Sequence, residues 1–301
     1  MEMDVFAKKV CKAVGEGLGR GFHIEVKDVR KNNGVILHGM LVTREGQNVA
    51  PTIYLDTFLN AYESGTPFEA IVRKLLGICR EDALQHNRVD MGFFQSFEKV
   101  RDRICYRLVG REKNGVLLGD MPYVEFLDMA ISFYYAYQGD ALGDGSISIH
   151  NSHMDIWGTD TAELLALAEC NTGRLFTWEC RTLEEVLDDM EGRDDGMGVL
   201  SADGRAAVPL KILSNDRKIY GACCMLYPGV LEGIAEKEGH SLYILPSSVH
   251  ETILLPDDGG FEPDRLRRMV SEVNRTEVAA EEVLTDSLYY YDKQKKEIVM
   301  A

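Results

Sequence analysis

One segment of the chain constrains the fold more than any other. Between Leu127 and Tyr137, apolar and aromatic residues occupy every second position. A period of two residues over that length indicates a long β-strand rather than a helix. A glycine-rich loop at 139–145 follows, and residues 146–150 return as a second strand. The fold must therefore contain a sheet whose strands are neighbours in sequence.

Hairpins and helices alternate along the rest of the chain. The pattern predicts helices over residues 3–14, 67–86, 93–109, 160–170, 228–239 and 263–275, and the glycine run 15–21 is expected to end the first one. Strands are expected over residues 22–29, 34–43, 207–213, 219–227, 241–245, 249–255, 288–292 and 297–300. Antiparallel hairpins with inserted helices define an α+β fold.

We expect two packed subdomains, because the polar and turn-rich segment 111–115 separates two regions. The first is an N-terminal α+β region over residues 1–115, and the second is a C-terminal α+β region over residues 116–301. A chain of 301 residues is long enough for about two domains.

Negative charge is concentrated in one part of the chain. The net charge is −16, and residues 120–203 hold 18 acidic residues against three arginines, a net charge of −15. Sequence-independent binding to nucleic acid needs Lys and Arg to displace counterions from phosphates. Direct nucleic-acid binding is therefore disfavoured, and the acidic segment is either a solvated face or a surface for a basic protein partner.

The seven cysteines and the N-terminus predict a cytoplasmic location. The cysteines are scattered and odd in number, and no C-x-x-C pair occurs. That pattern fits neither a disulfide framework nor a structural zinc site. The N-terminus lacks the apolar run of a signal peptide, and no stretch is apolar for long enough to cross a membrane.

Residues 150–155 hold the densest group of side chains able to bind a metal. If a strand ends at His150, then His150, His153 and Asp155 converge in one turn. A catalytic metal site usually has three protein ligands and one open position. These residues are candidate metal ligands, and polar surface histidines are the simpler alternative.

The segment Ser247-Ser248-Val249-His250-Glu251 contains a hydroxyl, an imidazole and a carboxylate, the parts of a nucleophilic catalytic system. Ser248, His250 and Glu251 are therefore candidate catalytic residues. On a strand, however, His250 and Glu251 point to opposite faces. Alternation places Glu251 on an inward face, so a structural hairpin is the alternative.

Several longer segments resemble the family called domain of unknown function 5688. The likeness is carried by residues 48–55, 220–231, 242–256, 269–274 and 286–292, and it spans most of the chain. The resemblance implies a bacterial protein of the Firmicutes type. It implies no activity, cofactor or catalytic residue.

The sequence favours a non-catalytic protein-binding or regulatory protein that acts through an acidic surface and has another protein as its partner. The residues expected on that surface are Asp188, Asp189, Asp194 and Asp195. Two alternatives remain open: a hydrolase-type enzyme using His250 and Glu251 with a serine or a metal, and an acidic mimic of nucleic acid. We expect no cofactor and no membrane partner, and the sequence does not specify the oligomeric state.

Overall fold

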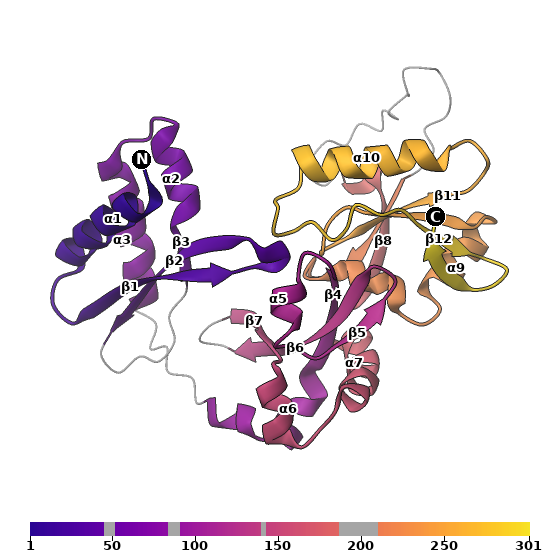
Figure 1. Cartoon of the computed structure of the whole chain (residues 1–301), viewed down its shortest axis with the longest axis horizontal. Coiled ribbons are helices and arrows are strands. Elements are labelled where there is room, and N and C mark those ends of the chain that lie inside the picture. Colours follow the sequence, from indigo (N-terminus) through magenta and orange to yellow (C-terminus); the bar gives the residue numbers. More distant parts are fainter. Residues whose placement is uncertain (45–51, 84–90, 140–142, 187–209) are drawn as a thin grey trace. The chain divides into compact units, whose positions relative to one another are not determined.

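The computed structural model describes residues 1–44, 52–83, 91–139, 143–186 and 210–301 (Figure 1). The chain forms two compact units, the first made of residues 1–94 and 137–145 and the second of residues 95–136 and 146–301. The described part contains three antiparallel sheets with helices between them, which confirms the α+β fold. Within these ranges, every helix is too short or too polar to span a lipid bilayer.

The first unit is a three-stranded sheet with three helices. The strands follow the order β1(Phe22–Arg30), β2(Ile36–Arg44), β3(Thr52–Tyr54), and the helices are α1(Met3–Leu18), α2(Leu55–Glu63) and α3(Phe68–Ala83). A short 3-10 turn, η1(Asn32–Gly34), joins β1 to β2. Asn33 and Gly34 have positive φ in this turn, which confirms the hairpin that their Asn-Gly pair predicts.

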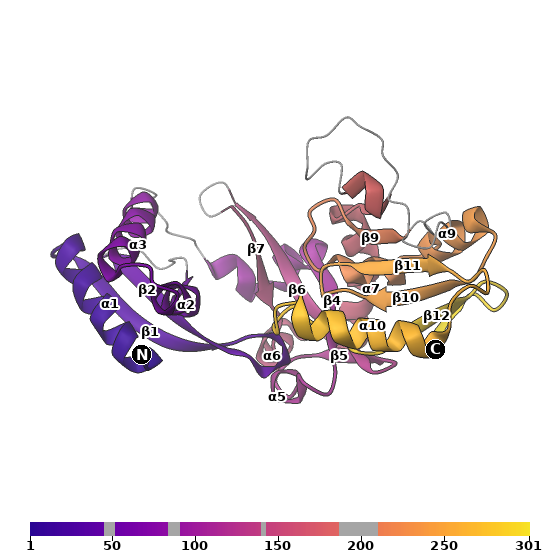
Figure 2. The same cartoon turned by 90° about the horizontal axis from the view of Figure 1, so that it is seen from above.

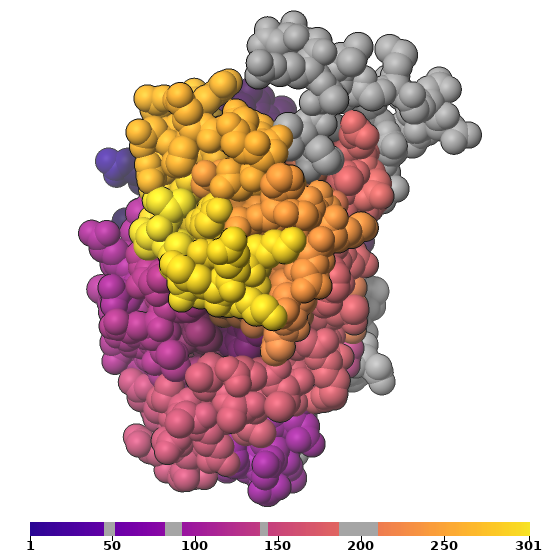
Figure 3. Space-filling view, turned by 90° about the vertical axis from the view of Figure 1, so that its right-hand side faces the viewer, coloured from indigo at the N-terminus to yellow at the C-terminus, as the bar shows by residue number. Residues whose placement is uncertain are grey.

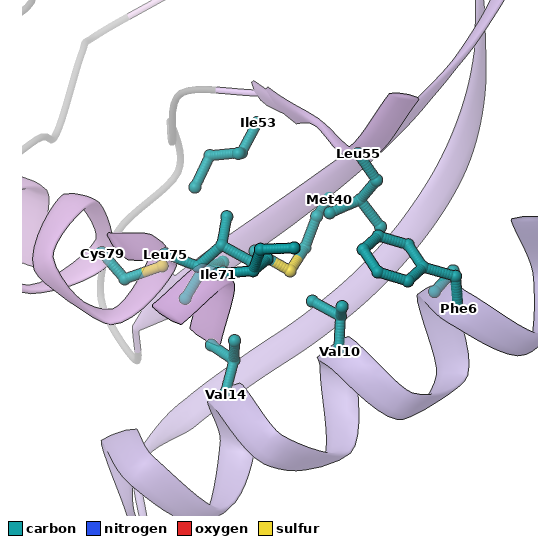
Figure 4. Close-up of a cluster of buried hydrophobic side chains, with 11 residues drawn as sticks. Phe6, Val10, Val14, Met40, Ile53, Leu55, Ile71, Leu75 and Cys79 are labelled. Atoms are coloured by element: carbon teal, nitrogen blue, oxygen red, sulfur yellow. The ribbon is translucent and has the colours of Figure 1, made fainter. Parts of the chain in front are cut away.

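The core of this unit lies between the sheet and the helices (Figure 4). Phe6, Val10 and Val14 project from one face of α1 and pack with Met40 and Leu75. The glycine run 15–21 ends α1 as expected, although four residues later than the predicted end at residue 14, because the helix continues to Leu18 and Gly19 is its C-cap. A Cβ at Gly17 would lie 2.7 Å from Leu76 Cδ1, so glycine lets α1 approach α3 closely.

A four-stranded sheet holds the long strand that the sequence predicts. The strands β4(Ile104–Gly110), β6(Met129–Gly139) and β5(Tyr123–Phe126) follow one another, and β7(Gly143–Ser148) also pairs with β6. All side chains from Met129 to Ala136 are buried, so both faces of β6 are covered. Helix α7(Thr161–Leu175) packs against β4 on one of these faces.

The second unit also contains a six-stranded antiparallel sheet. Its order is β13(Glu297–Met300), β12(Tyr289–Asp292), β10(Leu242–Pro246), β11(Thr252–Pro256), β9(Lys211–Asn215), β8(Trp178–Thr182). Helix α10(Pro263–Thr276) runs alongside β10 and β11 (Figure 2) and buries Leu266 and Val270 against them. The shorter helices are η2(Met91–Gln95), α4(Phe97–Val100), η3(Arg101–Arg103), α5(Gly115–Leu118), α6(Asn151–Trp157), η4(Gly221–Leu226) and α9(Val230–Glu238).

Two predicted elements were wrong in type. The expected helix over residues 93–109 is a series of short helical turns followed by strand β4. The expected strand over residues 219–227 is the 3-10 helix η4, which buries Cys223 and Cys224. Short apolar runs do not distinguish a buried strand from a helix, and here tertiary packing decides. The second unit begins at residue 95, and the division of the chain into regions 1–115 and 116–301 stays a prediction.

The C-terminal residues are joined to the four-stranded sheet by a group of hydrogen bonds around Asp128. This residue lies in the turn between β5 and β6. Its carboxylate accepts hydrogen bonds from Thr285 Oγ1 at 2.8 Å, from Ser287 Oγ at 2.7 Å and from the Tyr289 hydroxyl. In Figure 3 the C-terminal residues, in yellow, lie on the surface between magenta and orange residues of this unit.

Candidate functional site

The candidate site begins with Arg107, at the centre of strand β4. The six remaining residues of β4 are all buried and uncharged, and Arg107 is the one residue of this strand that is half-buried. Because side chains alternate along a strand, Arg107 lies on the same face as Cys105 and Val109. Its partner across the sheet is Ser132 of β6.

Two small apolar clusters lie on either side of this Arg107–Ser132 pair. One cluster contains Cys105, Tyr134, Ala136 and Phe176, with Tyr220 packed against it. The other contains Val109, Leu118 and Ala130, with Tyr123 packed against it. The guanidinium therefore lies between these two apolar clusters, on one face of the sheet.

Neutral hydroxyl groups are the hydrogen-bond partners of the Arg107 guanidinium. Nε donates to Ser132 Oγ at 3.3 Å, Nη1 donates to the Tyr220 hydroxyl at 2.9 Å, and Nη2 donates to Ser148 Oγ at 3.0 Å. Ser146 Oγ lies 3.4 Å from the same tyrosine hydroxyl. The group extends from the buried Ser132 to the exposed Ser146.

No acidic side chain in the described part of the chain forms an ion pair with Arg107. Two neighbouring groups that can ionise, Cys105 and Tyr134, favour their neutral forms. Burial raises the pKa of Cys105 to about 12, and burial is the main cause that raises the pKa of Tyr134. Arginines are seldom buried without a partner charge. The positive charge of Arg107 is thus left uncompensated by the described residues around it.

Tyr220 connects Arg107 to His250. The Arg107 guanidinium carbon lies 4.9 Å from the centroid of the Tyr220 ring. The Tyr220 and His250 rings are stacked, with their centroids 5.9 Å apart and an interplanar angle of 15°. Its backbone is in the left-handed region, with φ of 53°. The Tyr220 N–H donates to His250 Nδ1 at 3.1 Å, and His250 Nε2 lies 4.0 Å from Glu282 Oε1.

The candidate catalytic residues lie in a turn rather than on a strand. The expected strand over 249–255 begins only at Thr252, so Glu251 is half-buried in the turn and does not point inward from a strand. Ser248 Oγ accepts from the His250 backbone N–H at 3.0 Å, and Glu251 Oε1 accepts from Ser247 Oγ at 3.4 Å. Among the described residues, no hydrogen bond joins the His250 imidazole to a serine hydroxyl, as nucleophilic catalysis requires.

The candidate metal ligands are brought together only in part. His150 precedes helix α6, and its Nδ1 lies 2.8 Å from Asp120 Oδ2. His153 Nδ1 accepts from the His150 N–H at 3.0 Å, and burial followed by the neighbouring His150 lowers the pKa of His153. Asp155 is exposed and lies two residues further along α6, on nearly the opposite side. The described ranges contain no group of three or more His, Cys, Asp or Glu placed to hold a metal.

The predicted acidic surface falls outside the described residues. This applies to all four of its residues, Asp188, Asp189, Asp194 and Asp195. Arg107 and Tyr220 were missed because β4 was expected to be part of a helix and η4 part of a strand. The available signal was a single arginine inside the apolar run Ile104–Val109.

Comparison with known proteins gives one match. A family model described as a family of unknown function (DUF5688) matches residues 3–293. No curated protein and no solved structure matches the chain.

Proposed function

The chain belongs to a family of unknown function, DUF5688, and from that premise we propose that it is a non-catalytic binding protein. Its second unit binds a ligand that carries an oxyanion, such as a phosphate, sulfate or carboxylate group. The observation that supports this proposal is the half-buried Arg107, whose described partners are all neutral hydroxyls.

Charge and hydrogen-bond donors both favour an anion at this position. A guanidinium has five N–H donors; three donate to Ser132, Ser148 and Tyr220, and the other two have no partner among the described residues. Ser132 and Ser148 accept from Arg107, and a hydroxyl that accepts still carries its own O–H. Hydrogen bonds between such donors and an ionised oxyanion are about twice as strong as neutral ones. The group therefore offers N–H and O–H donors around one positive charge.

A binding role is favoured over catalysis by the contacts of the possible nucleophiles. The Ser248 hydroxyl accepts from the His250 backbone N–H. The Ser132 and Ser148 hydroxyls accept from the Arg107 guanidinium. A nucleophilic serine needs a base within hydrogen-bond reach of its hydroxyl. In the described part of the chain, none of these three hydroxyls contacts an imidazole or a carboxylate.

The experiment is a calorimetric titration of the full-length protein with sodium sulfate, sodium phosphate and sodium acetate. We expect saturable binding of at least one anion. Because the net charge of −16 repels anions, the titration is made at about 0.15 M ionic strength, where charges are screened beyond about 8 Å.

Two variants and a control locate the site. Arg107→Gln removes the charge and is expected to weaken binding about 10- to 100-fold, the effect of hydrogen bonds to a charged group. Tyr220→Phe removes one hydroxyl and is expected to weaken binding less. Arg111→Gln is the matched control, since Arg111 is already paired with Glu125 and lies outside the site.

Stability measurements show whether each variant is folded. A ligand present at 100 times its dissociation constant raises the free energy of unfolding by about 2.7 kcal/mol, which also gives a second readout of binding. The proposal is refuted if the wild-type protein binds none of the three anions. It is also refuted if folded Arg107→Gln binds as tightly as the wild type.

A protein partner for the acidic segment stays a prediction from the sequence. It is supported by the net charge of −15 over residues 120–203. Neutralising the four aspartates Asp188, Asp189, Asp194 and Asp195 is expected to reduce the salt dependence of any binding to a basic protein.

A further inference from the structure

We infer that His250 is a positioning residue of the Arg107 site and makes anion binding dependent on pH. The inference rests on the proposed function. His250 does not contact Arg107. It acts through Tyr220, the residue that contacts both, by holding the Tyr220 backbone and ring in place.

The Tyr220 backbone needs such a restraint. A positive φ of 53° is unusual for a residue other than glycine, asparagine or aspartate, and it persists only where the surroundings hold it. The hydrogen bond from Tyr220 N–H to His250 Nδ1 is one restraint. The His250 carbonyl is itself fixed, because it accepts from Ser214 Oγ at 2.8 Å.

The loop before Tyr220 is held by Asn215. Its Oδ1 accepts from the backbone N–H groups of Arg217 and Ile219, and its Nδ2 donates to the Ile219 carbonyl. The loop is therefore rigid up to Ile219, and His250 fixes the next peptide. As a result, the tyrosine hydroxyl lies 2.9 Å from Arg107 Nη1.

The hydrogen bond from Tyr220 requires His250 Nδ1 to be an acceptor. A backbone N–H only donates, so Nδ1 must carry a lone pair and the single proton of the neutral ring lies on Nε2. Adding a proton to Nδ1 replaces the acceptor by a donor and removes the hydrogen bond to Tyr220. The charged groups nearest to the ring are Glu282 at Nε2, the adjacent Glu251, and Arg107, whose guanidinium carbon lies 4.9 Å from the Tyr220 ring centroid.

Loss of this hydrogen bond has a defined consequence for the site. The left-handed peptide at Tyr220 is then free to relax, and the phenol moves away from Arg107. The guanidinium then loses one of the hydroxyl groups that hold it in place for the ligand. Anion affinity therefore falls when Nδ1 of His250 gains a proton and can no longer accept from Tyr220.

The experiment is a titration with sulfate from about pH 5 to about pH 8, the range in which histidine side chains change charge. Sulfate keeps its double negative charge throughout this range, so any pH dependence comes from the protein. We expect the wild-type affinity to fall about five- to tenfold toward the acidic end, the effect of one hydrogen bond on an equilibrium.

Two substitutions at His250 distinguish the effect of its hydrogen bond to Tyr220 from the effect of its side-chain volume. His250→Asn places an amide oxygen near the position of Nδ1, keeps an acceptor for Tyr220 N–H and does not titrate. It is expected to retain wild-type affinity at pH 8 and to show a flat profile. His250→Leu removes the acceptor and is expected to bind sulfate about tenfold more weakly at every pH. His240→Asn is the control, since His240 is an exposed histidine of the same unit.

The outcomes distinguish this inference from the proposed function. If the wild-type protein does not bind sulfate, phosphate or acetate, the proposed function fails and this inference fails with it. If sulfate binding depends on Arg107 and His250→Asn keeps the wild-type pH profile, the inference alone is overturned. Should His250→Leu not fold, the comparison of wild type with His250→Asn still decides.

Discussion

Replacing Asp128 by asparagine tests the hydrogen bonds that join the C-terminal residues to the four-stranded sheet. The Asp128 carboxylate accepts from three hydroxyls, those of Thr285, Ser287 and Tyr289. Asparagine keeps one acceptor oxygen and presents two N–H donors toward groups that also donate. We therefore expect Asp128→Asn to lower the free energy of unfolding of the second unit.

The magnitude follows from which hydroxyls are buried. Tyr289 is fully buried and Thr285 is 9% exposed, whereas Ser287 has partial access to water. The retained amide oxygen can accept from one of the two buried hydroxyls, so one buried donor loses its partner, and the expected loss is about 1–3 kcal/mol. The matched control is Asp264→Asn, in which an exposed carboxylate paired with Arg267 is removed, with an expected loss below about 1 kcal/mol.

The effect of Asp128→Asn depends on pH in a predictable direction. Burial alone raises the pKa of Asp128, but the hydrogen bonds from Tyr289, Ser287 and Thr285 outweigh it and hold that pKa below its usual value. A folded-state pKa below the unfolded one means that the charged form stabilises the fold. This contribution is fully present above the unfolded value of about 3.9 and is lost as the pH falls through the folded value. The wild type and the variant should therefore converge in acid.

The assay is urea unfolding followed by tryptophan fluorescence at several pH values between about 3 and 7. Both tryptophans of the chain, Trp157 and Trp178, lie in the second unit, so the signal reports on the unit that contains Asp128. The reasoning is refuted if the two proteins differ by less than about 0.5 kcal/mol at pH 7, or if their difference is the same at pH 7 and pH 3.

Two further substitutions test the packing around the site. Thr252→Val should leave stability unchanged or raise it by up to about 1–3 kcal/mol in urea unfolding, because the buried Thr252 hydroxyl has no hydrogen-bond partner among the described residues; a clear loss of stability would contradict this. Gly221→Ala should destabilise the second unit by about 1–3 kcal/mol or more in the same assay, because a Cβ would lie 2.3 Å from Ser214 Oγ and 2.5 Å from the His250 carbonyl oxygen; wild-type stability would show that this backbone can move.

The parts of the fold that sequence predicts well are those with a local signal. The alternation from Leu127 to Tyr137 predicts β6, which spans Met129–Gly139. Its start is displaced because Leu127 and Asp128 form the turn to β5, with Leu127 at a positive φ. The amphipathic face of α10 and the Asn33-Gly34 hairpin are also local signals, and both elements are present.

The parts that sequence does not predict depend on partners that are distant along the chain. Strand β4 is apolar on both faces because α7 covers one side and Tyr220 and Phe176 pack on the other. Neither partner is visible from residues 93–109. The turn that holds Ser248, His250 and Glu251 is likewise fixed by Ser214 and by Glu282, whose carbonyl accepts from Val249 N–H at 2.8 Å. These contacts cannot be inferred from residues 249–255 alone, so the local pattern predicted a strand that begins three residues too early.

Arg107 is the one charged residue within the apolar run Ile104–Val109. Within an apolar strand it removes a charge from water without a counter-ion among its described neighbours, and a well-packed apolar residue would cost less there. In most natural proteins each residue suits its local environment in the fold, and the exceptions occur mainly at functional sites. The residues that surround Arg107 come from β4, β6, β7 and the loop before η4, so the fold brings four separate segments to one guanidinium. The half-buried charge and its neutral hydroxyl partners are the observations that support the proposed oxyanion ligand, which would supply the missing negative charge.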